Sequence, residues 1–180
     1  SVLHQSEDIA IHSLMCIIAS DIILTSDFIR AIQIVDKFSE KFIVFSQRWN
    51  LSVTKLIDFT SSWEDTIKDE LADRGRMYTR TGVDYVVYPR GLFGKVPPFA
   101  VGRRGYDNWL LRTAKANGAD LVDVTPVVKS VHQDHDYSYH PDGVKGVMYG
   151  DEARINTELV GSRSQRFMIK DRTHILTSQG

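Results

Sequence analysis

Apolar residues in this chain fall into short continuous runs, separated by stretches in which they recur at helical spacing. A continuous apolar run of about five residues is typical of a strand that is covered on both faces. Runs of this kind, and shorter ones, predict strands over residues 15–19, 41–46, 84–88, 99–101, 121–124 and 127–131.

The helices between these strands are marked by capping residues and by glycine stops. Thr25 or Ser26 is a suitable cap for a helix that continues through Val35. The stretch 62–65 resembles a capping box, and Gly75 is a plausible stop for its helix. Further helices are expected over residues 6–13, from Asp107 to about 117, and over 151–160, with a polar loop over 133–149. Strands that alternate with helices predict an α/β layered sheet.

Polar residues follow several of the predicted strands, and ligands of such sheets bind at the carboxyl ends of the strands. Asp21 comes soon after the first strand, and Arg90 follows the strand over 84–88. Asp107 comes after the strand over 99–101, and His132 comes directly after the strand over 127–131. We therefore expect one rim of the sheet to collect Asp21, Arg90, Asp107 and His132.

Asp107 is expected in the first turn of a helix, directly after the glycine-containing stretch 102–105. Free backbone N–H groups and the positive end of the helix dipole would hold a carboxylate there in a fixed direction. Those are properties of a general base. An ordinary N-terminal cap is the alternative, because aspartate is a favoured cap residue. Trp109, close to Asp107, is a candidate for stacking on a substrate.

Asp21 separates two apolar blocks, which is costly for a carboxylate unless it is paired, hydrogen-bonded or bound to a metal. It is a candidate metal ligand, with capping of the next turn as the alternative. Residues 132–140 contain three histidines and two aspartates, a density that suggests a second source of ligands. His132 is the best-placed ligand of the group, and His135 is expected on a solvated loop. A metal-dependent hydrolase centred on His132, Asp134 and His135 is an alternative interpretation of this cluster.

Composition narrows the classes of protein. The 180 residues suit one domain, and 42% apolar and 25% charged residues are ordinary for a soluble globular protein. A net charge of −1 gives no broad basic field for nucleic acid or an anionic membrane. Cys16 is the only cysteine, so an internal disulfide and a cysteine-based zinc site are excluded. Cys16 is expected to be buried, no apolar run could span a bilayer, and a reducing cytoplasmic setting is predicted.

Several segments resemble glycosyltransferases that use nucleotide sugars. Residues 18–24, with Ser20-Asp21-Ile22, resemble the Asn-Ser-Asp-Ile segment of enzymes with the GT-A fold. A group of family 2-like glycosyltransferases is similar in order and spacing over residues 84–93, 97–103, 105–110, 123–125 and 132–138. The resemblance covers most of the chain and implies a GT-A-like α/β fold.

The resemblance also implies a reaction and roles for individual residues. A sugar would pass from a nucleoside-diphosphate donor to an acceptor hydroxyl by direct displacement, with inversion. Asp107 would be the base, and Asp21 and His132 would hold a divalent cation, Mn²⁺ or Mg²⁺, on the diphosphate. Arg90 or Arg103 would meet the charge of the diphosphate or the acceptor.

Two departures from the family pattern lead to further expectations. Asp21 is a single carboxylate where many relatives have two, so the metal is expected to depend on the bound diphosphate for ligands. The strand-helix-strand half that grips the nucleotide in the GT-A fold does not precede Ser1. Residues 1–180 are therefore interpreted as one domain, the catalytic and acceptor half of such an enzyme. An uncovered sheet edge and self-association are expected, and a non-catalytic carbohydrate-binding or assembly module is a third interpretation.

Overall fold

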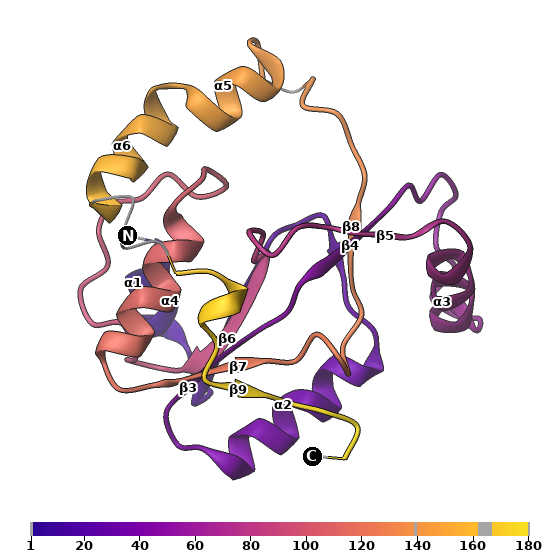
Figure 1. Cartoon of the computed structure of the whole chain (residues 1–180), viewed down its shortest axis with the longest axis horizontal. Helices are drawn as coiled ribbons and strands as arrows, with labels where there is room; N and C mark the ends of the chain where they lie inside the picture. The colour runs from indigo at the N-terminus through magenta and orange to yellow at the C-terminus, as the bar shows by residue number, and fades with distance from the viewer. Residues whose placement is uncertain (1, 139, 162–166, 180) are drawn as a thin grey trace.

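The computed structural model of the protein describes residues 2–138, 140–161 and 167–179. Helices flank two sheets that each contain parallel and antiparallel strand pairs, so the predicted α/β class is confirmed (Figure 1). The helices are α1 (Val2–Ile9), α2 (Ser26–Phe38), α3 (Trp63–Arg74), α4 (Tyr106–Ala116), α5 (Gly143–Tyr149), α6 (Asp151–Val160) and the short 3₁₀ helix η2 (Ile169–Asp171). The strands are β1 (Leu14–Ile18), β2 (Ile22–Ile23), β3 (Phe42–Phe45), β4 (Arg48–Leu51), β5 (Arg76–Met77), β6 (Tyr85–Pro89), β7 (Asp120–Asp123), β8 (Ser130–Gln133) and β9 (His174–Ile175).

The larger sheet has the strand order β1-β6-β3-β7-β9. Strand β6 is antiparallel to both of its neighbours, while β3, β7 and β9 run parallel to one another. The carboxyl ends of β1, β3 and β7 therefore meet at one edge, beside the start of β6.

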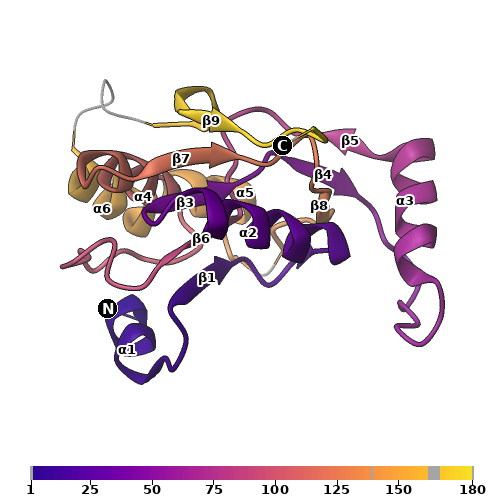
Figure 2. The same ribbon diagram turned by 90° about the horizontal axis from the view of Figure 1, so that it is seen from below.

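Both faces of this sheet are covered. Alternate residues of β3 enter different cores: Ile43 and Phe45 pack with α4, whereas Phe42 and Val44 pack with α2. Figure 1 shows α4 above these strands and α2 below them, and in Figure 2, which is seen from below, α2 lies in front of the strands. This burial on both sides explains the continuous apolar run that β3 presents in the sequence.

The smaller sheet has the order β2-β8-β4-β5 and extends from the same edge. Three strands of the larger sheet continue into it after short connections, since β1 leads to β2, β3 to β4 and β7 to β8. Helix α3 covers this sheet through Ile67 and Leu71, which pack on Leu51 and Val131. The junction between the sheets is thus where the turn between β1 and β2, the start of β4, the residue before β6 and strand β8 lie.

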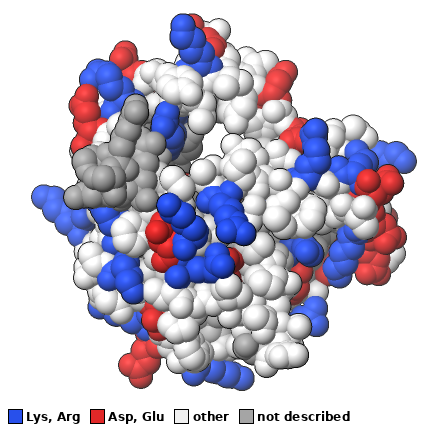
Figure 3. All heavy atoms as spheres, in the orientation of Figure 1, with Lys and Arg blue, Asp and Glu red and all other residues white. Residues whose placement is uncertain are grey.

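Helices α5 and α6 form an arch beyond this junction (Figure 1). Helix α6 packs on α4, and α5 leads back through residues 134–142 to β8. The space-filling view shows an opening beneath the arch, between α5 and the body of the molecule (Figure 3). In the same view positive and negative side chains are interspersed around α3, as the near-zero net charge indicates.

The first helix and the predicted strand over 99–101 differ from expectation. Helix α1 covers 2–9 and not 6–13, because residues 10–13 pair with the end of β6: Arg90 donates from its guanidinium to Ala10 O and from its backbone N–H to Ser13 O. The prediction of a strand over 99–101 is wrong. The N–H and carbonyl of Ala100 are bonded by the side chain of Asn156, so no neighbouring strand satisfies them.

Two predictions around β8 also need correction. The strand begins at Ser130 and includes His132, because the N–H groups of Val127 and Val128 bond back to Val124 O in a turn. The segment 133–149 is not a continuous loop, since it contains α5, whose Val147 is buried; Tyr139 lies outside the described residues. Tertiary packing thus overrides the low helix propensity of its glycines.

Cys16 is exposed, contrary to expectation. Strand β1 lies at the edge of its sheet, and within the described residues it pairs with β6 alone. Helix α6 and the Gly161 stop match their predicted bounds. Among the described residues, no helix has both the length and the apolar character to cross a membrane.

Candidate metal centre

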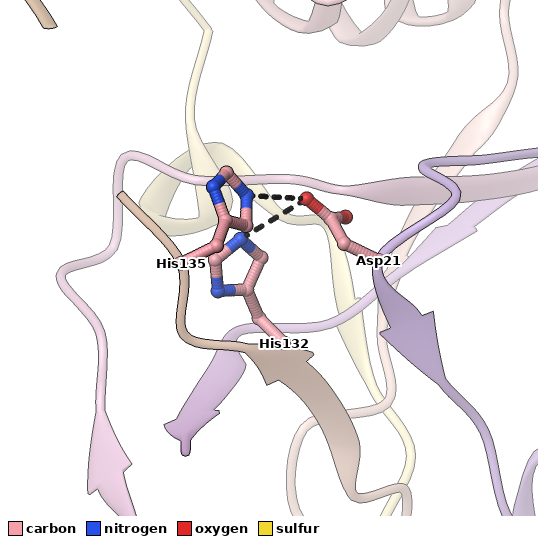
Figure 4. A group of neighbouring side chains, drawn as sticks. All are labelled: Asp21, His132 and His135. Carbon is pink, nitrogen blue, oxygen red and sulfur yellow. Dashed lines mark hydrogen bonds and ion pairs between the residues drawn. The ribbon is translucent and has the colours of Figure 1, made fainter. Parts of the chain in front are cut away.

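Asp21, His132 and His135 come together at the junction of the two sheets, and we call them the Asp21 cluster (Figure 4). Asp21 lies in the turn between β1 and β2, His132 is on β8, and His135 follows two residues after that strand. The pairing of Ile22 with His132 fixes the register that brings the turn beside β8. Asp21 Oδ2 lies 3.3 Å from His132 Nε2 and 3.0 Å from His135 Nε2.

The hydrogen bonds of His135 determine which of its nitrogens faces Asp21 with a lone pair. Nδ1 lies 2.6 Å from the carbonyl oxygen of Asp136, which can only accept, so Nδ1 carries a proton. In the neutral ring Nε2 is then unprotonated and points its lone pair at Asp21 Oδ2. Two acceptors 3.0 Å apart need a cation or a proton between them. Contact with Asp136 O and Asp21 also raises the pKa of His135, since both favour the protonated ring.

His132 is buried, with 6% of its surface exposed. Burial lowers its pKa, and the nearby positive charge of Arg48 lowers it further, against the opposing effect of Asp21. The ring is therefore neutral at pH 7, the state in which imidazole binds a metal. Its Nδ1 and the second oxygen of Asp21, Oδ1, are buried without a hydrogen-bond partner among the described residues.

These features fit a divalent cation. The three candidate ligand atoms lie within 4.8 Å of one another. Neighbouring ligands about 2.1 Å from one ion lie about 3 Å apart, which is the spacing of Asp21 Oδ2 from the two imidazoles. The bond from His135 to a backbone carbonyl is the usual support for a metal-binding histidine. Two imidazoles and one carboxylate suit Mn²⁺, Fe²⁺ or Zn²⁺ better than Mg²⁺, which prefers oxygen ligands.

Asp84 and Arg48 form an ion pair beside the Asp21 cluster. Arg48 Nη1 lies 2.7 Å from Asp84 Oδ1, and the side chains are only 12% and 19% exposed. Burial raises the pKa of Asp84 and the charge of Asp21 adds to this, while Arg48 and His132 oppose it. Its second oxygen, Oδ2, is buried without a partner among the described residues. Asp84 thus belongs to the same electrostatic environment as the cluster.

Asp107 is the second residue of α4, and Gly105 occupies the cap position before it. Helix α4 joins β7 through a short turn and packs antiparallel on it, so its first turn lies toward the edge where β7 ends. Burial raises the pKa of Asp107 to about 6, with a further contribution from the charge of Asp84, although the backbone N–H groups of Asn108, Asp107 and Gly105 act in the opposite direction. Asp84 therefore interacts both with Asp107 and with the Asp21 cluster.

Comparison of the chain with protein-family models, curated proteins and solved structures gave no match. The functional argument therefore depends on the arrangement of these side chains.

Arg90, Arg103 and Trp109 lie apart from the Asp21 cluster or are engaged elsewhere. Arg90 follows Pro89, which pairs with Leu14, so it is at the opposite end of β1 from Asp21. Arg103 Nε bonds to Glu152 at 2.8 Å. Trp109 is 7% exposed and packs on Phe93 and Phe99 in the core, which leaves no ring face for a sugar. These contacts are within the protein, and the substrate contacts expected of the three residues stay predictions.

Asp134 is also outside the cluster. Its Oδ2 lies 3.0 Å from Arg76 Nη2, and Asp21 takes the place beside the two histidines that the hydrolase interpretation gave to Asp134. The sequence predicts a solvated loop for His135, which follows the predicted strand in a polar segment, and His135 is indeed exposed and outside β8. The chain leaves the strand at Asp134, and this break turns His135 toward Asp21. No sequence signal marked Arg48, whose role depends on its partner Asp84.

Proposed function

We propose that the protein is a metal-dependent glycosyltransferase that moves a sugar from a nucleoside-diphosphate donor to an acceptor hydroxyl, with inversion. The observation that supports it best is the Asp21 cluster, which joins two residues implied as metal ligands by the family resemblance, 111 positions apart in the chain. The raised pKa of Asp107 is the second support. The GT-A-like character of the fold is part of this proposal.

Asp21, His132 and His135 would hold the divalent cation. A bound cation supplies positive charge to the diphosphate of the donor and so favours its departure. Burial keeps the His132 imidazole neutral and ready to bind, and the positive charge of Arg48 acts in the same direction, while the carboxylates of Asp21 and Asp84 oppose it. The protein offers three ligands, so we expect the metal to take further ligands from the diphosphate and to bind together with the nucleotide.

Asp107 acts as the base. The acceptor oxygen attacks the anomeric carbon, its proton passes to the Asp107 carboxylate, and the bond from that carbon to the diphosphate oxygen breaks with its electron pair on the leaving group. A pKa of about 6 leaves Asp107 ionised at pH 7 and makes it more basic than an ordinary aspartate. The backbone N–H groups of Gly105, Asp107 and Asn108 favour the ionised form of the Asp107 carboxyl, the form that a base requires.

Calorimetric titration with Mn²⁺, in the presence and absence of uridine or guanosine diphosphate, tests the metal site. Asp21→Asn removes a charged ligand of the cluster and is expected to weaken Mn²⁺ binding at least about tenfold. Asp134→Asn is the matched control, because it removes a neighbouring carboxylate that pairs with Arg76 and not with the cluster. Equal affinities in the two variants would contradict the proposal.

Release of nucleoside diphosphate from a panel of nucleotide sugars, with Mn²⁺ and mixed saccharide acceptors, tests the reaction. Turnover that needs an acceptor supports a transferase. A metal-dependent hydrolase is the second candidate, favoured by the presence of two histidines beside Asp21. It predicts turnover of phosphoester or amide substrates with Zn²⁺ and without any acceptor. Metal and carbohydrate binding with no turnover would instead indicate a binding module.

A further inference from the structure

The loop before Asp107 is held by helix α6. Asn156, on that helix, is fully buried and makes a pair of hydrogen bonds to one residue of the loop. Its Oδ1 accepts the backbone N–H of Ala100 at 2.9 Å, and its Nδ2 donates to the carbonyl of Ala100, also at 2.9 Å. Nδ2 also lies 3.5 Å from the carbonyl of Arg103. Both polar atoms of this buried side chain are thus used on the loop backbone.

Apart from the packing of Phe99 on Tyr106 and Trp109, the loop has no regular structure to hold its shape. Residues 97–104 form neither helix nor strand, and Gly102 and Gly105 adopt positive φ angles of 77° and 97°. Gly105 lies against α6 as well, because a Cβ there would be 3.3 Å from Val160 Cγ2 and 3.9 Å from Asn156 O. The carbonyl of Gly105 accepts the N–H of Trp109 and so starts α4.

Two further contacts connect the loop to the arch, and both are at the surface. Arg103 pairs with Glu152, whose side chain is 59% exposed, and the Arg104 guanidinium lies 5.5 Å from the ring centre of Tyr149, which is 70% exposed. Exposed ion pairs contribute little to stability, whereas buried bidentate hydrogen bonds to backbone are costly to remove. The buried contact of Asn156 is therefore the main polar tie between α6 and this loop.

We propose that Asn156 is a positioning residue for the base: by fixing the backbone at Ala100 and Arg103 it sets the start of α4 and hence the place of the Asp107 carboxyl. This inference rests on the proposed function, in which Asp107 takes the acceptor proton. Asn156 itself is separated from the reacting atoms by the loop. Its effect is transmitted through Ala100, Gly105 and the first turn of α4.

The titration of Asp107 tests this role. Carboxyl-labelled aspartate is followed by NMR in the full chain, with the Asp107 signal assigned from Asp107→Asn. Asn156→Ala frees the loop and lets more water reach the partly exposed Asp107, so its midpoint is expected to fall from about 6 by about one pH unit or more. Hydrogen exchange at the Ala100 amide is expected to accelerate at least about tenfold. Ala153→Gly is the matched control: it weakens the same helix at a buried position, and both signals are expected to stay unchanged.

An unchanged Asp107 midpoint in Asn156→Ala, with faster exchange at Ala100, would overturn the inference, because the loop would then move without moving the base. Equal shifts in Asn156→Ala and Ala153→Gly would also overturn it, since general loosening of α6 would explain them. If Asn156→Ala does not fold, Asn156→Ser removes the paired contact with a smaller loss of polarity. Mn²⁺ binding reports separately on the proposed function and is expected to be unchanged in each variant.

Discussion

At the scale of single residues, burial gives the site its chemistry. Asp107 and His132 both lose water on folding, and the consequences are opposite in sign because one is anionic and the other cationic when charged. The Asp107 carboxyl becomes a stronger base, while the His132 ring stays neutral. Neither property can be assigned to an isolated aspartate or histidine in a sequence.

The substitution Asp107→Asn separates a base from a structural carboxylate. It keeps the shape of the side chain and an acceptor for the backbone N–H groups, but it removes the basic oxygen. We expect kcat for transfer to fall by about 10² to 10⁴, the usual contribution of a general base, with little change in donor affinity. Steady-state kinetics at saturating acceptor checks this. Full activity in the variant would show that Asp107 is not the base and has only a structural role.

The stability of the protein is expected to depend on pH through Asp107. The folded-state pKa of about 6 is raised above the ordinary aspartate value of about 3.9, so folding favours the protonated carboxyl. This contribution to the free energy of unfolding is fully present below about pH 3.9 and is lost as the pH rises through about 6. The Asp107→Asn variant does not lose this stability as the pH rises, because asparagine does not titrate. Urea unfolding at pH 4, 5, 6 and 7 is expected to show the variant gaining about 1–2 kcal/mol relative to wild type across that range. A constant difference between the two proteins would show that Asp107 is not desolvated.

At the scale of elements, the site depends on connections more than on helices and strands. The turn between β1 and β2 carries Asp21, the residues after β8 carry His135, and the loop before α4 controls Asp107. The pairing of the strands fixes the position of each connection, as the pairing of Ile22 with His132 does for the turn that carries Asp21. The side chains of Asp21 and His135 then meet His132 at the junction of the two sheets.

Gly105→Ala tests the entry to α4. Gly105 has a φ of 97°, and its added Cβ would lie 3.3 Å from Val160 Cγ2. We expect a loss of about 2 kcal/mol, from the unfavourable backbone conformation together with crowding. Gly118→Ala is the control, since Gly118 has a φ of 79° with no atom within 4 Å of the added Cβ. Its expected loss is about 1 kcal/mol. Chemical denaturation measures both, and equal losses would show that the contact with α6 is not tight.

At the scale of the whole molecule, the outer edge of the larger sheet is unprotected. Strand β1 has no partner on that edge among the described residues, and its Cys16 and Ile18 are exposed. A strand edge with apolar side chains and no charge tends to pair with another chain. The composition of β1 offers no charged residue to prevent pairing.

We therefore expect self-association of the chain at micromolar concentration, measured by multi-angle light scattering. Ile18→Lys places a charge on the exposed edge strand and is expected to shift the protein toward monomer. Val144→Lys, at an exposed position on α5, adds the same charge away from that edge and is expected to leave association unchanged. A wild-type protein that is monodisperse and monomeric would contradict the prediction.

The sequence by itself determined those features that depend on local pattern. The apolar run 41–46 became β3, and the caps and stops near Gly75 and Gly161 bound α3 and α6, because periodicity and capping act within a few residues. It also brought Asp21 and His132 into consideration, since a carboxylate between apolar blocks and a histidine at a strand end need partners.

Only the tertiary structure decided which partners they have. His135 joined Asp21 in place of Asp134, Arg48 met Asp84, and Trp109 entered the core, because each outcome depends on strand order and on contacts between distant segments. The bonds of Asn156 to Ala100 turned a predicted strand into a fixed loop for the same reason. Local pattern selects the elements, whereas burial and pairing across the fold set the charge state and direction of each side chain in the site.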